Sequence, residues 1–322
     1  MLDRLRADVR NLATPHGRMA GTPGHAEARR YITGRAKELA LEPYAHGRFE
    51  FPYPAGEIKL VNVLARLPGA RRSLPPVLIA AHYDTCGPLP GADDNASAIA
   101  IAFAMVGPLR ERELHRDVIF AFFDAEEPPH FLTPTMGSTH YYENQRDEPI
   151  HCAVVLDLLG HDLPIPGHED MLFVLGMESD KGLASVIERT SGPESLRVAA
   201  VPNQYIGDMS DHHVFRIHQR PYLFFSCGQW EHYHLPTDTP EKLNYEKMER
   251  ITRYLVDIVA AVSAEPLAGP FEGYDSTPLE LALMRRHAGP LADEMGMVLN
   301  SRDEFRSFVE ALVVRFGLLT DR

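Results

Sequence analysis

Histidines and carboxylates gather directly after four short apolar runs of the sequence, and they are the residues with the clearest chemical potential. They are His82 and Asp84, Asp93 and Asp94, Asp124, Glu126 and Glu127, Asp157, and His232 and His234. A carboxylate within or beside an apolar strand is costly unless it is paired or binds a metal. We therefore expect these side chains to form one polar site.

The residue types at this site suit a pair of metal ions. Imidazole and carboxylate ligands are typical of zinc and similar borderline ions. A shared carboxylate can hold two such ions ~3.5–4 Å apart with water between them, which lowers the pKa of the water and polarises a carbonyl. A carboxylate that binds no metal can then accept the water's proton and pass it to a leaving amine. The Glu126-Glu127 doublet offers one ligand and one base for such a hydrolysis.

Each of these motifs is weak on its own. A His-x-Asp triplet such as residues 82–84 arises by chance in a chain with 16 histidines, and residues 168–170 are a second such case. An acidic doublet is more often a solvated corner, and a single histidine after a strand is more often hydrogen-bonded than metal-bound. The shared position at strand ends favours a metal site over these separate explanations.

The elements that must position these residues alternate between strand and helix. Apolar runs predict buried strands within residues 75–83, 117–125, 151–160, 171–176 and 220–228, and two extended segments are expected within residues 46–67. Helical spacing predicts helices over residues 2–12, 24–41, 94–106, 136–145, 180–190 and 244–262. Gly107-Pro108 is expected to end the third of these helices. The alternation predicts an α/β fold, a three-layer sandwich with a largely parallel central sheet and helices on both faces.

Composition excludes several classes of partner and location. The net charge of -13 argues against nucleic acid and an anionic membrane as partners. No window is long and apolar enough for a membrane span, and the first residues lack the apolar segment of a secretory signal. Three cysteines argue against a disulfide framework and favour free thiols in a reducing compartment. These features predict a cytoplasmic protein. They are also compatible with a homo-oligomer.

Seven segments, taken in order, resemble one known family. They are GRMAGTPGHAEARRYI, AHYDT, GADDNASA, FFDAEE followed by GS, VVLDLLG, SDHHVF and YHLPTDT. In this order they resemble the co-catalytic zinc aminopeptidases among the clan MH metallopeptidases, of which animal-type glutaminyl cyclases are a branch. The similarity covers roughly residues 15–262.

The resemblance implies two bound divalent ions, expected to be zinc, and a role for each matching residue. His82 and Asp157 would hold one ion, and Glu127 and His234 the other. Asp94 would bridge both ions. His234 is preferred to His232 because the family pattern places three residues between this histidine and an Asp-Thr pair.

The resemblance further implies roles for residues that bind no metal. Glu126 would be the general base, and Asp84 would orient the His82 ring. Tyr233 would donate a hydrogen bond to a developing oxyanion. The implied activity is that of a metal-dependent exopeptidase, an aminopeptidase or dipeptidase, acting on peptides with a free N-terminus.

Two departures from the family pattern leave alternatives open. The segment PPHFLTPTM separates the glutamate doublet from Gly137-Ser138, and the cyclase branch also has an insertion there. A glutaminyl-peptide cyclotransferase with a single zinc is therefore the first alternative, although Asp93-Asp94-Asn95 matches the two-metal peptidases better. A non-catalytic binding module on a peptidase fold is the remote alternative. The second departure is at the C-terminus: residues 1–265 are expected to form the zinc exopeptidase catalytic domain, and residues 266–322 a helical appendage with two helices within 278–318.

Several further residues have competing interpretations. Asp211, His212 and His213 could serve the substrate site or stabilise a loop. His161 is expected in an exposed loop, and Trp230 could wall the substrate pocket or simply pack. Cys86 lies between the ligand segments, and we interpret it as packing because the implied ligand set is complete without it.

Overall fold

The computed structural model describes residues 1–193, 195–268 and 275–318. Its strands are β1 (Glu42–Pro43), β2 (Glu50–Ala55), β3 (Ile58–Leu67), β4 (Val77–His82), β5 (Val118–Phe123), β6 (Cys152–Leu156), β7 (Met171–Leu175), β8 (Arg197–Ala200) and β9 (Tyr222–Ser226). Its longer helices are α1 (Leu2–Leu12), α2 (Pro23–Glu38), α3 (Ala98–Arg110), α5 (Lys181–Arg189), α8 (Tyr245–Ala264), α9 (Thr277–Glu294) and α10 (Arg302–Phe316). Short helical segments are η1 (Ala92–Ser97), α4 (Gly137–His140), η2 (Tyr141–Gln145), η3 (Met177–Ser179), α6 (Asn203–Ile206), α7 (His212–Ile217) and η4 (Pro240–Lys242).

The strands form one mixed sheet in the order β1-β3-β5-β4-β6-β9-β7-β8, with β2 paired to β3. The central strands β5, β4, β6 and β9 are mutually parallel, so their carboxyl ends meet at one edge. Strand β3 joins β5 and strand β7 joins β9 in the antiparallel direction. The parallel part of the sheet is thus its centre, and the candidate residues follow those four central strands.

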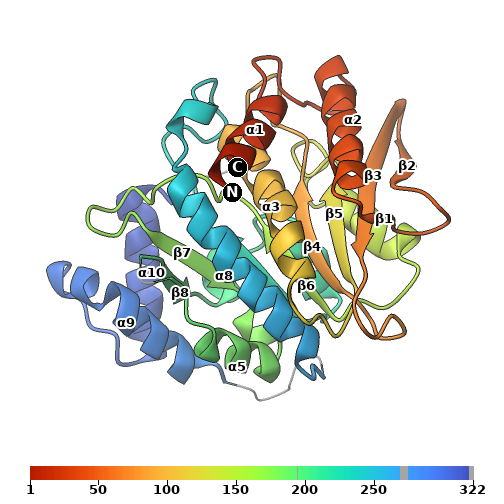
Figure 1. Cartoon of the computed structure of the whole chain (residues 1–322). Helices are drawn as coiled ribbons and strands as arrows, with labels where there is room; N and C mark the ends of the chain where they lie inside the picture. Colours follow the sequence, from red (N-terminus) through yellow and green to blue (C-terminus); the bar gives the residue numbers. More distant parts are fainter. Residues whose placement is uncertain (194, 269–274, 319–322) are drawn as a thin grey trace.

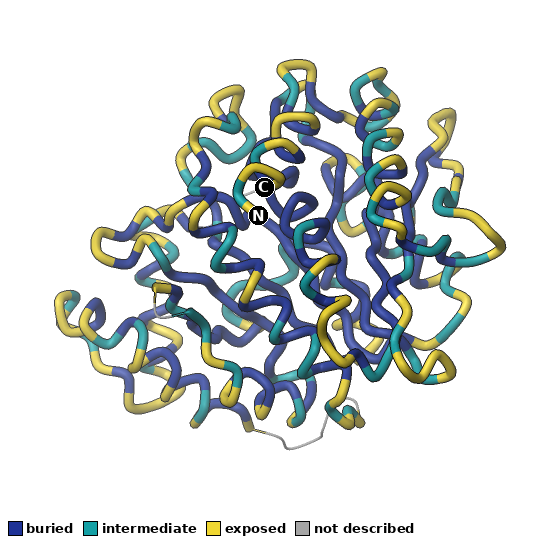
Figure 2. The backbone as a smooth tube through the Cα atoms, in the orientation of Figure 1, coloured by how far each residue is buried: buried dark blue, intermediate teal, exposed yellow. Residues whose placement is uncertain are grey.

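Side chains on alternate positions of the central strands enter two separate hydrophobic layers. In β4, for example, Ile79 belongs to the layer beneath α1, α2, α3, α5 and α8, whereas Leu78 belongs to the layer beneath η2, α7, α9 and α10. Figure 1 shows α1, α3 and α8 side by side in front of the sheet, and Figure 2 shows the strands as the most buried part of the chain. The predicted three-layer α/β sandwich with helices on both faces is confirmed.

Helix boundaries follow local sequence chemistry. Thr22 begins α2 by accepting a hydrogen bond from the backbone N–H of His25, and Asn244 begins α8 by accepting one from Lys247. The expected end of α3 at Gly107-Pro108 is wrong, because the helix continues to Arg110 with Pro108 inside it. A proline in the last turn removes only one helical hydrogen bond, so the helix can run on for a few residues.

The sequence patterns did not predict β8 or the two-residue β1. Strand β8 has only four residues, begins with Arg197 and lies at the edge of the sheet beside β7. So short a segment offers too few alternating positions for periodicity to distinguish a strand from a loop.

The two predicted C-terminal helices are present as α9 and α10. Met284 of α9 and Phe308 of α10 are fully buried in the same hydrophobic layer as Phe173 and Phe224 of the sheet. These helices complete the second helical layer over β7, β8 and β9. The division into residues 1–265 and 266–322 stays a prediction, and residues 269–274 and 319–322 of that segment lie outside the described residues.

Within the described ranges, we find no helix that combines the length and apolar character needed to traverse a lipid bilayer.

Candidate metal centre

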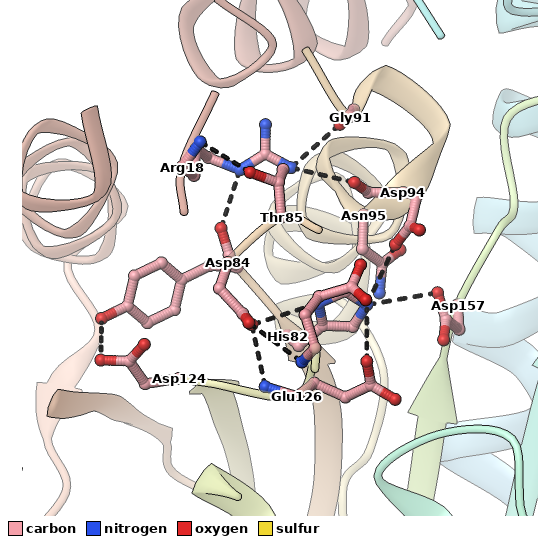
Figure 3. Close-up of polar contacts among 12 residues, drawn as sticks. Arg18, His82, Asp84, Thr85, Gly91, Asp94, Asn95, Asp124, Glu126 and Asp157 are labelled. Atoms are coloured by element: carbon pink, nitrogen blue, oxygen red, sulfur yellow. Dashed lines mark hydrogen bonds and ion pairs between the residues drawn. The ribbon is translucent and has the colours of Figure 1, made fainter. Parts of the chain in front are cut away.

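The carboxyl ends of the central strands bring most of the candidate residues together. His82 ends β4, Glu126 follows β5, Asp157 follows β6, and Asp94 lies in η1 (Figure 3). Glu127 comes directly after Glu126. Three groups of potential metal ligands have all their ligand atoms within 4.8 Å of one another. They are His82 with Asp94 and Asp157, His82 with Glu126 and Glu127, and Glu127 with His234 and Cys86.

Asp94 lies between two histidines and faces each with a different oxygen. Its Oδ1 is 3.3 Å from Nε2 of His82, and its Oδ2 is 3.0 Å from Nε2 of His234. On the first side, Asp157 Oδ1 is 3.5 Å from the same His82 nitrogen. On the second side, Glu127 Oε1 is 3.1 Å from the same His234 nitrogen. One carboxylate thus joins two clusters, each containing one histidine and one further carboxylate.

The two clusters differ in their burial. His82, Asp94 and Asp157 are all buried, whereas the side chain of His234 retains 23% of its exposure. His234 follows β9 on a loop, and the Tyr233 ring stacks on its ring with centroids 3.8 Å apart. The second cluster therefore lies nearer to solvent than the first.

Asp84 connects His82 to the glutamate doublet. Its Oδ1 lies 3.4 Å from Nδ1 of His82 and also accepts a 3.0 Å hydrogen bond from the N–H of Glu126. Its Oδ2 accepts a 3.0 Å hydrogen bond from the N–H of Glu127. The side chain of Glu126 extends to within 3.9 Å of Nε2 of His82 and is 1% exposed. Asp84 therefore holds the histidine and the doublet in one arrangement.

The loop that carries Asp94 is held by residues distant in sequence. Asp238 accepts hydrogen bonds from the backbone N–H groups of Asp93 and Asp94, at 2.9 and 3.1 Å. Arg18 is buried at 1% exposure and donates to the carbonyl oxygens of Tyr83 and Gly91, among others. It thereby ties the end of β4 to the Asp94 loop, as Figure 3 shows.

Three of the seven non-glycine residues with positive φ in the described part of the chain lie at or beside the ligands. Ala125, Leu158 and His234 have φ values of 53°, 54° and 54°, a region that non-glycine residues seldom adopt. Each is itself a candidate ligand or adjoins a candidate site residue. Strain of this kind persists only where surrounding contacts enforce it, and it often marks functional sites.

Electrostatics at the cluster favour added positive charge. Burial and the nearby Asp94 carboxylate raise the pKa of Glu127 to about 7. Burial opposes ionisation of Asp94, but the His234 and His82 rings outweigh it and hold the pKa of Asp94 below its usual range. Burial also disfavours charge on the two rings, yet the surrounding carboxylates raise the pKa of both well above the ordinary histidine value. A site with this preference suits divalent cations.

The donor set fits zinc. Among the described residues, Glu127 Oε2 and Asp157 Oδ1 are buried and make no hydrogen bond. Buried carboxylate oxygens without partners are costly unless a cation binds them. Together with two imidazole nitrogens, they form the nitrogen and oxygen set that zinc commonly takes.

Three residues that the sequence offered as candidate ligands contact residues outside the two clusters. Asp124 pairs with His25, with Nε2 2.6 Å from Oδ1, and accepts a hydrogen bond from the Tyr83 hydroxyl. Asp93 lies 2.6 Å from Nδ1 of His161. His232 contacts Thr237 in the exposed loop. These side chains support the loops around the site.

One expectation about a neighbouring residue is wrong. His161 is fully buried rather than exposed, because its ring lies between Asp93 and the Trp230 ring, with ring centroids 4.7 Å apart. The interpretation of Cys86 as packing stays a prediction, and its sulfur lies within 4.8 Å of possible ligand atoms of Glu127 and His234. Asp211 is fully buried, and burial raises its pKa to about 7.

Comparison with known proteins assigns the chain to a family. The model of peptidase family M28 matches residues 62–259, more than half of the chain. The chain belongs to peptidase family M28. The resemblance predicted from the sequence motifs is thus confirmed, and the match contains every candidate metal ligand of this M28 chain.

Individual relatives are distant. The uncharacterized protein YfbL of Escherichia coli (strain K12) is 24% identical over 215 residues, which cover 58% of this chain and 66% of that protein. Aminopeptidase YwaD of Bacillus subtilis (strain 168) is 25% identical over 187 residues, which cover 54% of this chain and 38% of that protein. The chain therefore spans less than two thirds of the length of either curated relative.

Solved structures share the fold at low sequence identity. LapB from Legionella pneumophila matches with a TM-score of 0.66 and 20% identity, over 82% of this chain and 72% of that one. A glutaminyl cyclase from Bacteroides thetaiotaomicron, bound to N-acetylhistamine, matches with a TM-score of 0.64 and 14% identity, over 81% and 97%. The chain therefore shares its fold both with LapB and with a glutaminyl cyclase.

Proposed function

We propose that this M28 chain is a zinc-dependent aminopeptidase that hydrolyses the N-terminal peptide bond of peptides. The observation that carries the proposal is Asp94, which faces His82 with one oxygen and His234 with the other. A carboxylate placed in this way suits two ions that share it as a bridge. His82 and Asp157 would hold the first ion, and Glu127 and His234 the second. Two zinc ions bound there would polarise the scissile carbonyl and make an attacking water more acidic.

The remaining polar residues would guide the proton and the charge. Glu126 would accept the proton of the water and pass it to the leaving amine, because it is buried beside the first cluster and is not needed as a ligand. Asp84 would orient His82 and the doublet. Tyr233 would donate a hydrogen bond to the developing oxyanion. Glu126 and Asp157 would also attract the substrate's free ammonium group, so N-acetylated peptides should be poor substrates.

An apolar cavity beside Asp157 suggests the preferred N-terminal side chain. The cavity has a volume of about 60 Å³ and is lined by Asp157, Leu158, Phe173, Leu175, Val201, Ile206, Met209, Phe224, Ser226, Gly228, Gln229, Met284, Val309, Leu312, Val313 and Leu318. At about 10–15 Å³ for each water-sized group, this space suits the four heavy atoms of a leucine or methionine side chain. We therefore propose preference for medium-sized apolar N-terminal residues, with α9 and α10 forming one wall of the pocket.

Filling the cavity tests this preference. Val309→Phe should lower kcat/KM for leucyl substrates by about 10- to 100-fold and leave alanyl substrates much less affected. Val314→Phe is the matched control, because Val314 lies on the same helix and is 83% exposed. Equal losses for leucyl and alanyl substrates would argue against this pocket.

A glutaminyl cyclase is the second candidate, favoured by the inserted segment at residues 128–136 and by the cyclases among the similar folds. Cyclisation uses the substrate's own amine as nucleophile, so one Lewis acid suffices. A single panel separates the two activities: amino acid release from dipeptides and aminoacyl anilides beside cyclisation of N-terminal glutamine peptides, each with and without a chelator. Cyclisation without release from any dipeptide would overturn the aminopeptidase proposal.

The compartment and the oligomeric state are further proposals. All three cysteines lie in the described part of the chain and are unpaired, which suits a reducing environment such as the cytoplasm. Fractionation of the native host would test the compartment, and light scattering would test whether the chain forms a homo-oligomer.

A further inference from the structure

A thiol lies at the second cluster of the metal centre. The sulfur of Cys86, a carboxylate oxygen of Glu127 and a ring nitrogen of His234 all lie within 4.8 Å of one another. Cys86 follows the His82–Asp84 segment, so the end of β4 supplies side chains to both clusters. Cys86 is partly exposed, whereas Cys152 and Cys227 are fully buried.

A second observation is a buried carboxylate oxygen of Glu127 that has no hydrogen-bond partner in the described part of the chain. Glu127 is 2% exposed, and its Oε2 makes no hydrogen bond among the described residues. A hydrogen bond between Cys86 and the His234 ring accounts for the position of the thiol, but it leaves the buried Glu127 oxygen without compensation. A cation between the three side chains would satisfy all of them.

We propose that Cys86 is a ligand of the second metal ion, together with Asp94, Glu127 and His234, an inference that rests on the proposed metal centre. The thiol loses its proton to solvent as the sulfur–metal bond forms. Zinc–sulfur bonds are about 2.3 Å and zinc–nitrogen and zinc–oxygen bonds about 2.0–2.2 Å, so tetrahedral ligands lie roughly 3.5 Å apart. The ligand atoms lie at most 4.8 Å apart, so each separation needs to shorten by about 1.3 Å at most to reach this geometry.

The thiol makes the two metal positions chemically different. The first position would have three protein donors, from His82, Asp94 and Asp157, and would keep a place open for water, as catalytic zinc sites do. The second position would have a fourth protein donor, and it would take up water or substrate by expanding to five ligands. A thiolate also favours zinc and cobalt over magnesium and manganese. The second position should therefore be the more selective for zinc.

Cobalt(II) substitution tests the sulfur–metal bond directly. Protein stripped with a chelator and loaded with two cobalt ions should show the near-ultraviolet charge-transfer band of a thiolate bound to cobalt. Cys86→Ala should lose this band, keep the visible cobalt bands of the first position, and bind the second ion at least about tenfold more weakly. Cys152→Ala is the control, because that thiol lies at the opposite end of β6 from the metal centre, and it should keep the band.

Thiol protection gives a second measurement on the unmodified chain. Metal-free protein should react at Cys86 with an alkylating reagent, and zinc should slow that reaction at least about tenfold, whereas magnesium should not. Two bound cobalt ions without a charge-transfer band, or a band that persists in Cys86→Ala, would overturn the thiol ligand. Dipeptide hydrolysis by the same sample would then leave the proposed function standing, whereas failure to bind any cobalt would overturn both.

Discussion

Two of the places where this molecule buries carboxylates, the metal centre and the surroundings of Glu280, differ in how the charge is compensated. At the metal centre, Asp94 and Glu127 lie beside the His82 and His234 rings. Between α9 and the segment after β7, Glu280 is 1% exposed, and burial followed by the neighbouring Glu178 charge raises its pKa to about 8. Its Oε1 accepts a hydrogen bond from the Ser276 hydroxyl, and its Oε2 has no hydrogen-bond partner.

The comparison separates two ways of burying an acid. Glu280 can remain protonated at neutral pH, which removes its charge without any cation. At the metal centre several carboxylates converge with histidines, and the candidate metal-ligand groups among the described residues all lie there. We infer that burial alone does not mark a metal site, whereas convergence of carboxylates with imidazoles does.

The largest expected effect is loss of the general base at the metal centre. Glu126→Gln should reduce kcat for dipeptide hydrolysis by at least about 100-fold while both ions remain bound, because the amide cannot accept the proton. Glu127→Gln should instead weaken the second ion. Kinetics and metal analysis of both variants would check this, and the reverse pair of phenotypes would show that the roles within the doublet are exchanged.

Metal removal should have the next largest effect, which is a loss of thermal stability. This loss should depend on the metal centre and not on Glu280. Ions present at about 1,000 times their Kd stabilise the folded state by about 4 kcal/mol per site, so a chelator should lower Tm by roughly 10 °C. Glu280→Gln should show the same loss on chelation as the unmodified chain. A Tm that is unchanged by chelation, measured by calorimetry, would argue against a bound metal.

The smallest expected effect concerns the pH dependence of stability at Glu280. Its pKa is about 8 in the folded chain against an ordinary value of 4.5, so the folded state keeps a proton that the unfolded state releases. The contribution of Glu280 to the free energy of unfolding is therefore fully present below about pH 4.5, and it is lost as the pH rises towards 8.

Glu280→Gln removes that titration. The variant should gain roughly 4 kcal/mol at pH 9 relative to pH 5, because about 1.4 kcal/mol is lost per pH unit over roughly three units. This corresponds to roughly 6 °C in the difference of Tm values. Melting curves of both proteins between pH 5 and 9 would check this. If Tm changed with pH equally in the variant and the unmodified chain, the pKa of Glu280 would not be raised. Glu310→Gln, at an exposed position of α10, is a matched glutamate control and should leave the pH profile unchanged.

The sequence predicted the fold and the cluster because both depend on local patterns. Apolar runs marked each of the four central strands, and the ligand residues follow those runs within a few positions. Parallel pairing then brings the strand ends to one edge, which is why His82 and Asp157 could be expected together before their contact was known.

The residues that the sequence did not predict act over long separations or through burial. Arg18 reaches the Asp94 loop from a segment more than 60 residues away, and no local pattern indicates such a contact. His161 was expected to be exposed because it lies in the loop after the Asp157 strand, yet Asp93 and Trp230 enclose it. Cys86 was interpreted as packing because a complete ligand set was already implied. Only the three-dimensional arrangement brings its sulfur beside Glu127 and His234.

The number and position of bound ions test the central claim most directly. Crystals of the zinc-loaded chain, measured at the zinc absorption edge, should show two anomalous peaks ~3.5–4 Å apart with one oxygen of Asp94 bound to each. His82 and Asp157 should contact one peak, and Glu127 and His234 the other. A single peak in fully loaded crystals, or two peaks that Asp94 does not bridge, would contradict the two-metal aminopeptidase.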